Sequence, residues 1–252
     1  MNSYHILMAK GGMTKSQVQK QCVNLLQQKL PSVLPVMRNR LKRWQLDIPE
    51  GHLARQATSL VNRAWKVAPP RVAMVLLRTY LYAWTTSRRF QDCHSPCCLC
   101  RVKGAQDSLE HFVFCPVVQE IATKIFKMAP FKDNGCLMSS RRRFLCFEAY
   151  TDEKLALGLL FLKVIYDLHN HKKHGGGYDC NLKDSLDLAR TYLYRASRGN
   201  SHTEAVVRRV LPTALPDFNT PKKKEKKRLP DATGDRPSKR RAGPGRPQED
   251  LS

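Results

Sequence analysis

The sequence predicts a mainly α-helical fold, in which a helical body carries one cluster of cysteine and histidine residues and ends in a disordered basic tail. Three observations predict it. Apolar residues recur at helical spacing through most of residues 1–211. Five of the nine cysteines and two of the eight histidines fall between Cys93 and Cys115. The last 41 residues are rich in proline and charge and offer almost nothing to bury, which is typical of disorder.

Residues 1–62 are expected to form an N-terminal helical region. Thr14-x-x-Gln17 has the form of a capping box, in which each side chain satisfies the other's exposed backbone donor. An apolar stripe at helical spacing follows further along the chain. It predicts buried positions at Leu34, Met37, Leu41 and Trp44.

Two consecutive prolines, Pro69–Pro70, are expected to end one helix after Val67 and to begin the next. A first-turn residue needs no amide donor, so proline is well placed there. We expect this next helix to run over about Arg71–Phe90. Tyr80 and Trp84 lie four residues apart on it, and this spacing predicts that both rings belong to the core.

Residues 129–211 are expected to form a C-terminal helical region. Two apolar stripes predict buried helix faces, at Leu155, Leu159, Leu162 and Tyr166 and at Leu182, Leu186, Ala189 and Leu193. The triplet His169–His171 (HNH) has the letters of a nuclease motif, but that nuclease site needs a strand, a hairpin and a helix as its frame. Here the triplet continues a helix, so we predict a basic helix end that Gly175 stops.

The spacing inside the cysteine cluster is that of a zinc knuckle. A Cys-x2-Cys turn brings two thiolates to one ion, and a second pair of ligands, four residues apart on one side of a helix, completes a tetrahedron. The residues between the two pairs include Gly104 and are numerous enough for a loop to return. The predicted ligands, named the CCHC group below, are Cys97, Cys100, His111 and Cys115.

Spacing alone leaves the choice of ligands partly open. Cys98 competes with Cys97, and Cys93 and His94 are alternative ligands. No apolar signal segment is evident at the N-terminus, so we expect an intracellular, reducing compartment, which favours metal binding over disulfides. A catalytic zinc needs an open position, and no glutamate is paired with a ligand as in a deaminase or protease. We therefore expect one structural Zn²⁺ and no catalytic residues.

The order of residues between Arg63 and Phe126 carries a family resemblance. In sequence, the chain has Trp65, Pro69–Pro70, an apolar stretch Val72–Trp84, Thr85–Thr86, Arg88, Cys97, Cys100, Glu110, His111 and Cys115–Pro116. This order resembles the zinc-binding segment that follows the polymerase in non-LTR (LINE-like) retroelement reverse transcriptases. The loop before His111 is longer than in that family, and the step from His111 to Cys115 is shorter. From this resemblance we expect residues 63–128 to form a zinc-binding segment of the reverse-transcriptase type.

The resemblance implies an accessory region that helps to position template RNA or target DNA. Polymerase chemistry needs clustered carboxylates to hold two metal ions, and no Asp-Asp pair occurs in the sequence. We therefore expect a noncatalytic nucleic-acid-binding remnant or accessory region, with no small-molecule substrate. Two alternatives are a fragment of an active polymerase or nuclease machinery and a zinc-stabilised protein-interaction module.

The charge balance favours a polyanionic partner. Lysine and arginine number 44 against 21 carboxylates, and the formal net charge is +23. Neutralising phosphates releases condensed counterions, so an excess of this size favours contact with nucleic acid. Basic residues interleave with aromatic ones before the cluster, and a second basic run follows it. The candidate phosphate contacts are Arg71, Arg78, Arg88, Arg89, Arg141, Arg142 and Arg143.

The tail, residues 212–252, carries two basic runs, Lys222–Arg228 and Lys239–Arg241. Their arrangement resembles a bipartite nuclear import signal, so we expect an import receptor as a partner and a nuclear or nucleocytoplasmic location. The longest apolar run, Leu155–Leu162, is far shorter than the roughly 20 residues that a membrane span requires. We therefore expect no membrane partner.

Overall fold

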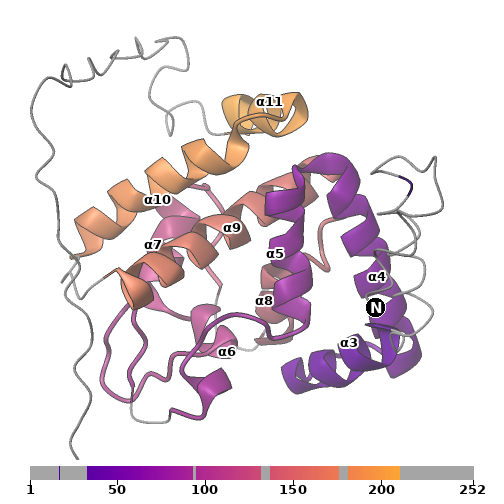
Figure 1. Cartoon of the computed structure of the whole chain (residues 1–252), viewed down its shortest axis with the longest axis horizontal. Helices are drawn as coiled ribbons and strands as arrows, with labels where there is room; N and C mark the ends of the chain where they lie inside the picture. The colour runs from indigo at the N-terminus through magenta and orange to yellow at the C-terminus, as the bar shows by residue number, and fades with distance from the viewer. Residues whose placement is uncertain (1–16, 18–32, 93–94, 132–136, 176–180, 211–252) are drawn as a thin grey trace, which may run out of the picture. The chain divides into compact units, whose positions relative to one another are not determined.

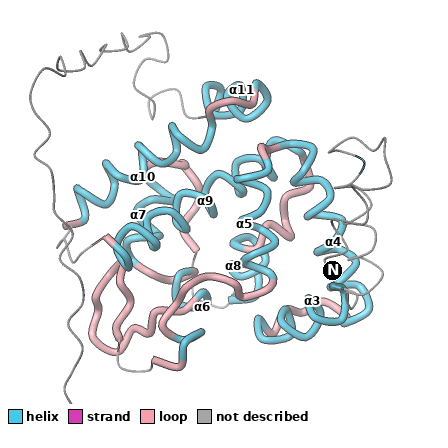
Figure 2. The backbone as a smooth tube through the Cα atoms, in the orientation of Figure 1, coloured by secondary structure: helices cyan, strands magenta, loops and turns pink. Residues whose placement is uncertain are grey.

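The fold is mainly helical in the part of the chain that the structure describes. This computed structural model describes residues 17, 33–92, 95–131, 137–175 and 181–210. Figure 2 shows helices and loops but no strand in these ranges, which confirms the predicted fold class. An isolated bridge joins Pro96 to Gln106. The predicted capping box, apart from Gln17, and the predicted tail lie outside the described residues.

The described helices belong to one compact unit, Met1–Pro216. In chain order they are α3 (Val33–Leu41), η1 (Lys42–Trp44), α4 (Glu50–Val67), α5 (Pro70–Tyr80), η2 (Arg88–Phe90), α6 (Leu109–Phe112), α7 (Pro116–Lys124), α8 (Leu137–Phe144), α9 (Asp152–His174), α10 (Leu182–Ser197) and α11 (Ser201–Val210). Two of these, η1 and η2, are single 3-10 turns. None of the helices in the described ranges is long and apolar enough to cross a bilayer.

Helix α9 is the centre of the unit. Its 23 residues span about 35 Å, and α4, α5, α10 and α11 all pack against it. Figure 1 shows α9 running between α10 and α5. The Thr151 side chain caps its first turn by accepting from the Lys154 amide at 3.2 Å. At the other end the Gly175 amide donates to the His171 carbonyl at 2.7 Å, so the predicted helix stop is confirmed.

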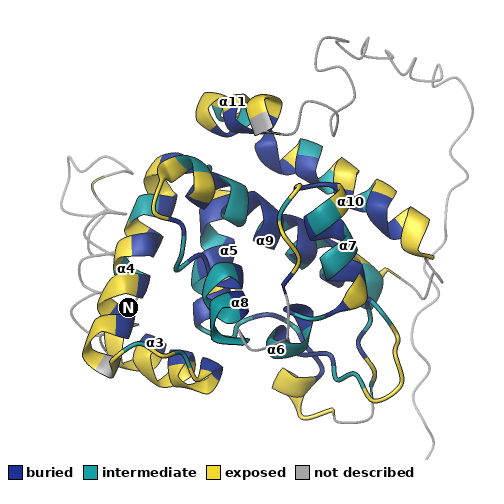
Figure 3. Cartoon of the chain, turned by 180° about the vertical axis from the view of Figure 1, so that it is seen from behind, coloured by how far each residue is buried: buried dark blue, intermediate teal, exposed yellow. Residues whose placement is uncertain are grey.

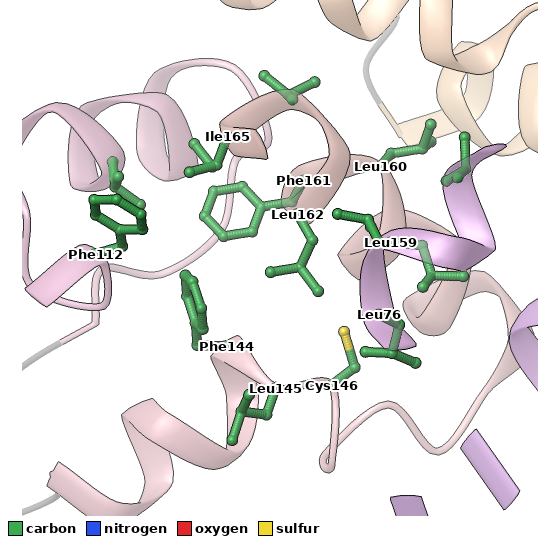
Figure 4. Close-up of a cluster of buried hydrophobic side chains, with 14 of the residues drawn as sticks. Leu76, Phe112, Phe144, Leu145, Cys146, Leu159, Leu160, Phe161, Leu162 and Ile165 are labelled. Carbon is green, nitrogen blue, oxygen red and sulfur yellow. The ribbon is translucent and has the colours of Figure 1, made fainter. Parts of the chain in front are cut away.

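Aromatic rings fill the core beside α9. Figure 4 shows Phe144, at the end of α8, near Phe161 of α9. Phe161 meets both Phe126 and Phe144 edge to face, with ring centroids 5.4 and 6.2 Å apart. Such pairs add about 0.5–1.5 kcal/mol to the free energy gained by burying their area. The core therefore holds α8, α9 and the segment after α7 in one arrangement.

The apolar stripes of the sequence mostly reach the core. The buried predicted positions are Met37, Leu41, Trp44, Leu155, Leu159, Leu162, Leu186, Ala189 and Leu193. Tyr166 is half-buried, whereas Leu34 and Leu182 are 44% and 41% exposed. Leu34 and Leu182 occupy the first turn of their helices, so each stripe begins before the packed surface does.

The expected helix over Arg71–Phe90 is wrong in length, because α5 ends at Tyr80. Tyr82 adopts a left-handed backbone with φ of 53°. The Tyr82 amide donates to the Thr79 carbonyl at 3.1 Å, and the Ala83 amide donates to the Arg78 carbonyl at 2.7 Å. This pair of bonds is a Schellman motif, which closes a helix. The chain then turns back over the end of α5.

Trp84 nevertheless reaches the core from outside the helix. Its indole nitrogen donates to the Thr79 hydroxyl at 3.1 Å, and the ring is fully buried. Tyr80 is fully buried too, and its hydroxyl donates to the Leu145 carbonyl at 2.8 Å. The prediction that both rings are core is therefore confirmed, although only Tyr80 lies on the helix.

Candidate metal centre

The four predicted ligands of the CCHC group meet at one place. The ligand atoms, three sulfurs and one imidazole nitrogen, all lie within 4.8 Å of one another. Cys100 Sγ lies 3.3 Å from His111 Nε2. Zn–S and Zn–N bonds of about 2.3 and 2.0 Å place tetrahedral ligands roughly 3.5–3.8 Å apart. The four side chains are therefore close to the spacing that a single tetrahedral metal ion requires.

The Cys97–Cys100 turn is shaped by its own backbone. The Arg101 amide donates to the Cys97 carbonyl at 2.8 Å, and Arg101 has a left-handed φ of 54°. The loop turns again at Gly104, where φ is +82°, a conformation that favours glycine. The Cys97 amide then donates to the Ala105 carbonyl at 2.7 Å. The loop returns as the sequence predicts.

The expectation that His111 and Cys115 share one helix is wrong. His111 lies in the four-residue helix α6, which ends at Phe112, and Cys115 is the residue before α7. Pro116 is the first residue of α7, and the residue before a proline is driven out of the helical region by its ring. Cys115 accordingly has an extended backbone, with ψ of 125°. The bend between α6 and α7 still brings both side chains to the same group.

The protonation of the group suits a metal ion. A hydrogen bond from Cys115, helped by one from His111, lowers the pKa of the Cys97 thiol, although burial acts in the opposite direction. The same contact with Cys97 and the burial of Cys115 raise the pKa of the Cys115 thiol. Two sulfurs thus compete for one proton in a buried space. A divalent ion would replace that proton and stabilise both thiolates.

The structure places Cys97, and not Cys98, in the CCHC group. Cys98 Sγ lies 3.9 Å from Asp107 Oδ1 and 4.0 Å from the His169 carbonyl oxygen. Burial, followed by the nearby Asp107 charge, raises the pKa of the Cys98 thiol. Cys98 is therefore a neutral packed thiol beside the candidate centre. The other alternative ligands, Cys93 and His94, lie outside the described residues.

Asp107 is the hub of a buried polar network that the sequence did not predict. Its Oδ2 accepts from the Ser87 amide at 2.9 Å, the Ser87 hydroxyl at 3.2 Å and the Lys173 ammonium at 3.1 Å. Its Oδ1 lies 3.2 Å from His169 Nε2. Burial raises the pKa of Asp107, but the contacts with His169, Ser87 and Lys173 outweigh it and bring the pKa down to about 2. We call these residues the Asp107 network.

Cys98, Asp107 and His169 also form a close trio, but the contacts of Asp107 favour a structural role. Three donors already engage its carboxylate, and one of them is the positively charged Lys173. A second cation at this place would meet that charge in a buried space. The Asp107 network instead joins the loop of residues 97–107, called the knuckle loop below, to the C-terminal end of α9. Lys172 adds to this junction by donating to the Leu99 carbonyl at 3.3 Å.

Several of the predicted phosphate contacts are engaged in the fold itself. Arg71 donates to the carbonyls of Arg195 and Arg198 at the end of α10, at 2.7 and 2.5 Å. Arg78 donates to the Tyr166 hydroxyl at 2.5 Å and lies over its ring. The structure does not bring these two arginines together with the other predicted phosphate contacts.

The run Arg141–Arg143 lies on α8 and is half-buried. Arg141 donates to the Trp44 carbonyl at 2.8 Å. Arg143 donates to the Pro130 carbonyl at 2.7 Å, and its guanidinium lies 4.4 Å from the centre of the Phe131 ring. Arg141 therefore ties η1 to α8, and Arg143 ties the loop after α7 to it.

Arg88 and Arg89 lie together on the exposed turn η2, next to the candidate metal centre. Arg88 pairs with Glu110 at 3.1 Å, and Glu110 directly precedes the ligand His111. Arg89 donates to the Ala83 carbonyl at 3.0 Å. Figure 3 shows exposed residues around α6, in contrast to the buried faces of α9.

Sequence reasoning missed His169 and Asp107, although a signal for His169 was present. His169 follows Leu162 and Ile165 at helical spacing, which places it on the buried face of α9, and it is fully buried. Asp107 carried no such signal, because its partners come from distant segments.

The chain matches no protein-family model, no curated protein and no solved structure.

Proposed function

We propose that this chain is a noncatalytic nucleic-acid-binding module whose CCHC group holds one structural zinc ion. The convergence of three sulfurs and one imidazole nitrogen on one point carries this proposal. Soft sulfur ligands favour zinc over magnesium or calcium, which prefer oxygen. Four protein ligands leave no open coordination position, so the ion would act as a scaffold.

The surroundings of the CCHC group also support a scaffolding role. Glu110, the carboxylate next to His111, is paired with Arg88 and accepts from the Tyr82 hydroxyl at 3.2 Å. It is thus engaged in contacts other than the group. When bound, zinc would fix the bend between α6 and α7 and the Cys97–Cys100 turn relative to each other.

Nucleic acid is the proposed partner because of charge and resemblance. The net charge of +23 and the exposed arginines on η2 suit contact with phosphates. The order of Trp65, the proline pair and the CCHC group supports a role like that of the zinc-binding segment of non-LTR retroelement reverse transcriptases. The partner is accordingly retroelement RNA or its target DNA.

The salt dependence of binding tests this function. The affinity of the full chain for labelled RNA and DNA oligonucleotides is measured by fluorescence anisotropy from low to physiological salt. We expect the affinity to fall steeply, with a log–log slope of about −0.7 for every phosphate neutralised on a single strand. A polyglutamate peptide of matched charge is the control, because it distinguishes binding of nucleic acid from attraction to any polyanion. A flat salt response would contradict nucleic-acid binding and favour the protein-interaction alternative.

A further inference from the structure

A pocket of about 440 Å³ lies beside the candidate metal centre and is lined by four arginines. Arg40 comes from α3 and Arg43 from η1, whereas Arg88 and Arg89 come from η2. Figure 1 labels α3 and α6, which both contribute to this pocket. We call it the arginine pocket. Only Arg88 and Arg89 were predicted phosphate contacts.

The charge of the arginine pocket is unbalanced. Glu110 is the one carboxylate among the lining residues, and Arg88 already pairs with it. Arg43 lies 5.5 Å above the Tyr82 ring, and Arg40 has no acidic partner among the residues that the structure describes. Each guanidinium carries five N–H donors, of which these contacts use few. The pocket therefore offers positive charge and donors to an anion.

The donors suit phosphate groups in particular. The planar fork of a guanidinium matches two oxygens of one phosphate, and several arginines around a pocket can hold one strand of backbone. The neutral polar residues Thr86, Gln91 and Ser108 also line the pocket and can bond sugar or phosphate oxygens.

An exposed aromatic ring adjoins the arginine pocket. Phe90 belongs to the same turn as Arg88 and Arg89, and it is 63% exposed. The Arg89 guanidinium lies 5.8 Å from the centre of its ring. An exposed ring beside arginines can stack on an unpaired base, which a duplex does not present. The combination therefore favours a single strand.

The segment that leads to the candidate ligand His111 forms part of the pocket wall. Ser108, Leu109 and Glu110 line the pocket and directly precede the ligand His111. The Ser108 hydroxyl accepts from the His111 amide at 3.2 Å, which ties this wall to the CCHC group. An ion bound by His111 would hold the wall in place.

We propose that the arginine pocket is the binding site for the backbone phosphates of single-stranded nucleic acid, with Phe90 stacking on a neighbouring base. This inference rests on the proposed nucleic-acid-binding function and gives that function a location. In this proposal Arg40 and Arg43, from α3 and η1, bind the phosphates together with Arg88 and Arg89 from η2.

The first test removes two pocket charges in the full chain. We expect the double substitution Arg40→Ala, Arg43→Ala to weaken binding of a labelled single strand of about 16 nucleotides by tenfold or more at low salt. The log–log salt slope should become less steep by about 1.4, the contribution of two phosphate contacts. The matched control is Arg38→Ala, Arg55→Ala, which removes the same charge from exposed positions outside the pocket.

The outcomes separate the pocket from the function. Equal affinities for the pocket variant and the control variant would overturn the pocket as the binding site. The proposed function would still stand in that case if the wild-type chain bound the strand. A wild-type chain that bound no strand at low salt would overturn both. Zinc content and circular dichroism of the two variants must match those of the wild type, so that a folding defect cannot explain a loss.

The second test concerns the single strand. Phe90→Ala should weaken binding of a single strand about tenfold, and its effect on a duplex of the same sequence should be within twofold. Phe90→Trp should restore binding, because an indole ring stacks at least as well. Equal losses on single strand and duplex, or no loss on either, would overturn the stacking role.

Discussion

Asp107 links the knuckle loop to two other segments through one buried carboxylate. Its partners are Ser87 before η2 and the pair His169 and Lys173 on α9. Removing one partner from such a buried group leaves the others unpaired and costs far more than the intact contact contributes. Asp107 thus ties its loop to the helical body through contacts that are separate from those of the CCHC group.

Asp107→Asn should lower the free energy of unfolding by about 1.5–3 kcal/mol, because the buried donors from Ser87 and the half-buried Lys173 ammonium would lose their charged acceptor. Urea unfolding monitored by circular dichroism measures the loss. Asp187→Asn is the matched control, since Asp187 forms an exposed pair with Arg190 whose loss should cost under about 1 kcal/mol. Equal losses for both substitutions would contradict a special role for Asp107.

The difference in unfolding free energy between the wild type and Asp107→Asn should depend on pH. The pKa of Asp107 is lowered in the folded chain, from 3.8 to about 2, so its ionised form stabilises the fold above pH 3.8. That contribution is lost as the pH falls from 3.8 towards 2. The difference in unfolding free energy between wild type and Asp107→Asn should therefore stay constant from pH 7 to about 4 and shrink below it. A difference that shrank already between pH 7 and 5 would contradict this assignment.

Substitution of Cys100 and of Cys98 should have different effects on the zinc affinity of the chain. Cys100→Ser removes a ligand of the CCHC group, whereas Cys98→Ser changes a thiol that faces Asp107 instead. Structural zinc contributes about 10–16 kcal/mol in zinc-finger peptides, so we expect Cys100→Ser to lose zinc affinity by orders of magnitude. Competition with a chromophoric chelator measures this affinity. Cys98→Ser should retain zinc, and a loss as large as that of Cys100→Ser would show that Cys98 is a ligand.

Helix α9 packs closely against the turn that follows α8. A side-chain carbon added at Gly158 would lie 2.8 Å from Cys146 Sγ, closer than such atoms approach. Figure 4 shows Cys146 among the buried side chains of this contact. Gly158 therefore sits in the middle of a long helix because the neighbouring turn needs the space, despite its cost to helix stability.

Gly158→Ala should destabilise the fold. The gain of about 1 kcal/mol in helix propensity is outweighed by an overlap that costs about 1–3 kcal/mol. In the Cys146→Ala background the same change should stabilise, and a double-mutant cycle by urea unfolding measures the coupling. Gly51→Ala on α4 is the control, because its new carbon meets only the flexible end of Arg55 at 3.9 Å. A Gly158→Ala effect as favourable as that of Gly51→Ala would contradict this packing.

The sequence predicted those features of the fold and of the candidate metal centre that depend on local spacing. Helical periodicity placed Leu159 and Leu193 in the core, and ligand spacing identified the CCHC group. The end of α5 was missed because a tyrosine, without a glycine or proline signal, adopts the left-handed turn. The break before Cys115 could have been read from Pro116, which starts α7.

The arginine pocket could not have been predicted in the same way. Arg40 and Arg43 lie more than 40 residues before Arg88 and Arg89, and only the packing of α3 against α4 and α5 brings them together. The import signal of residues 212–252 stays a prediction, because that segment lies outside the described residues.

We infer that one zinc ion organises the CCHC group. Native mass spectrometry of the full chain, purified without added metal or chelator, measures the bound metal. We predict a mass increase of one zinc ion per chain, lost together with the ordered knuckle when the protein is treated with a strong chelator. A fully folded chain that carried no metal would contradict the claim.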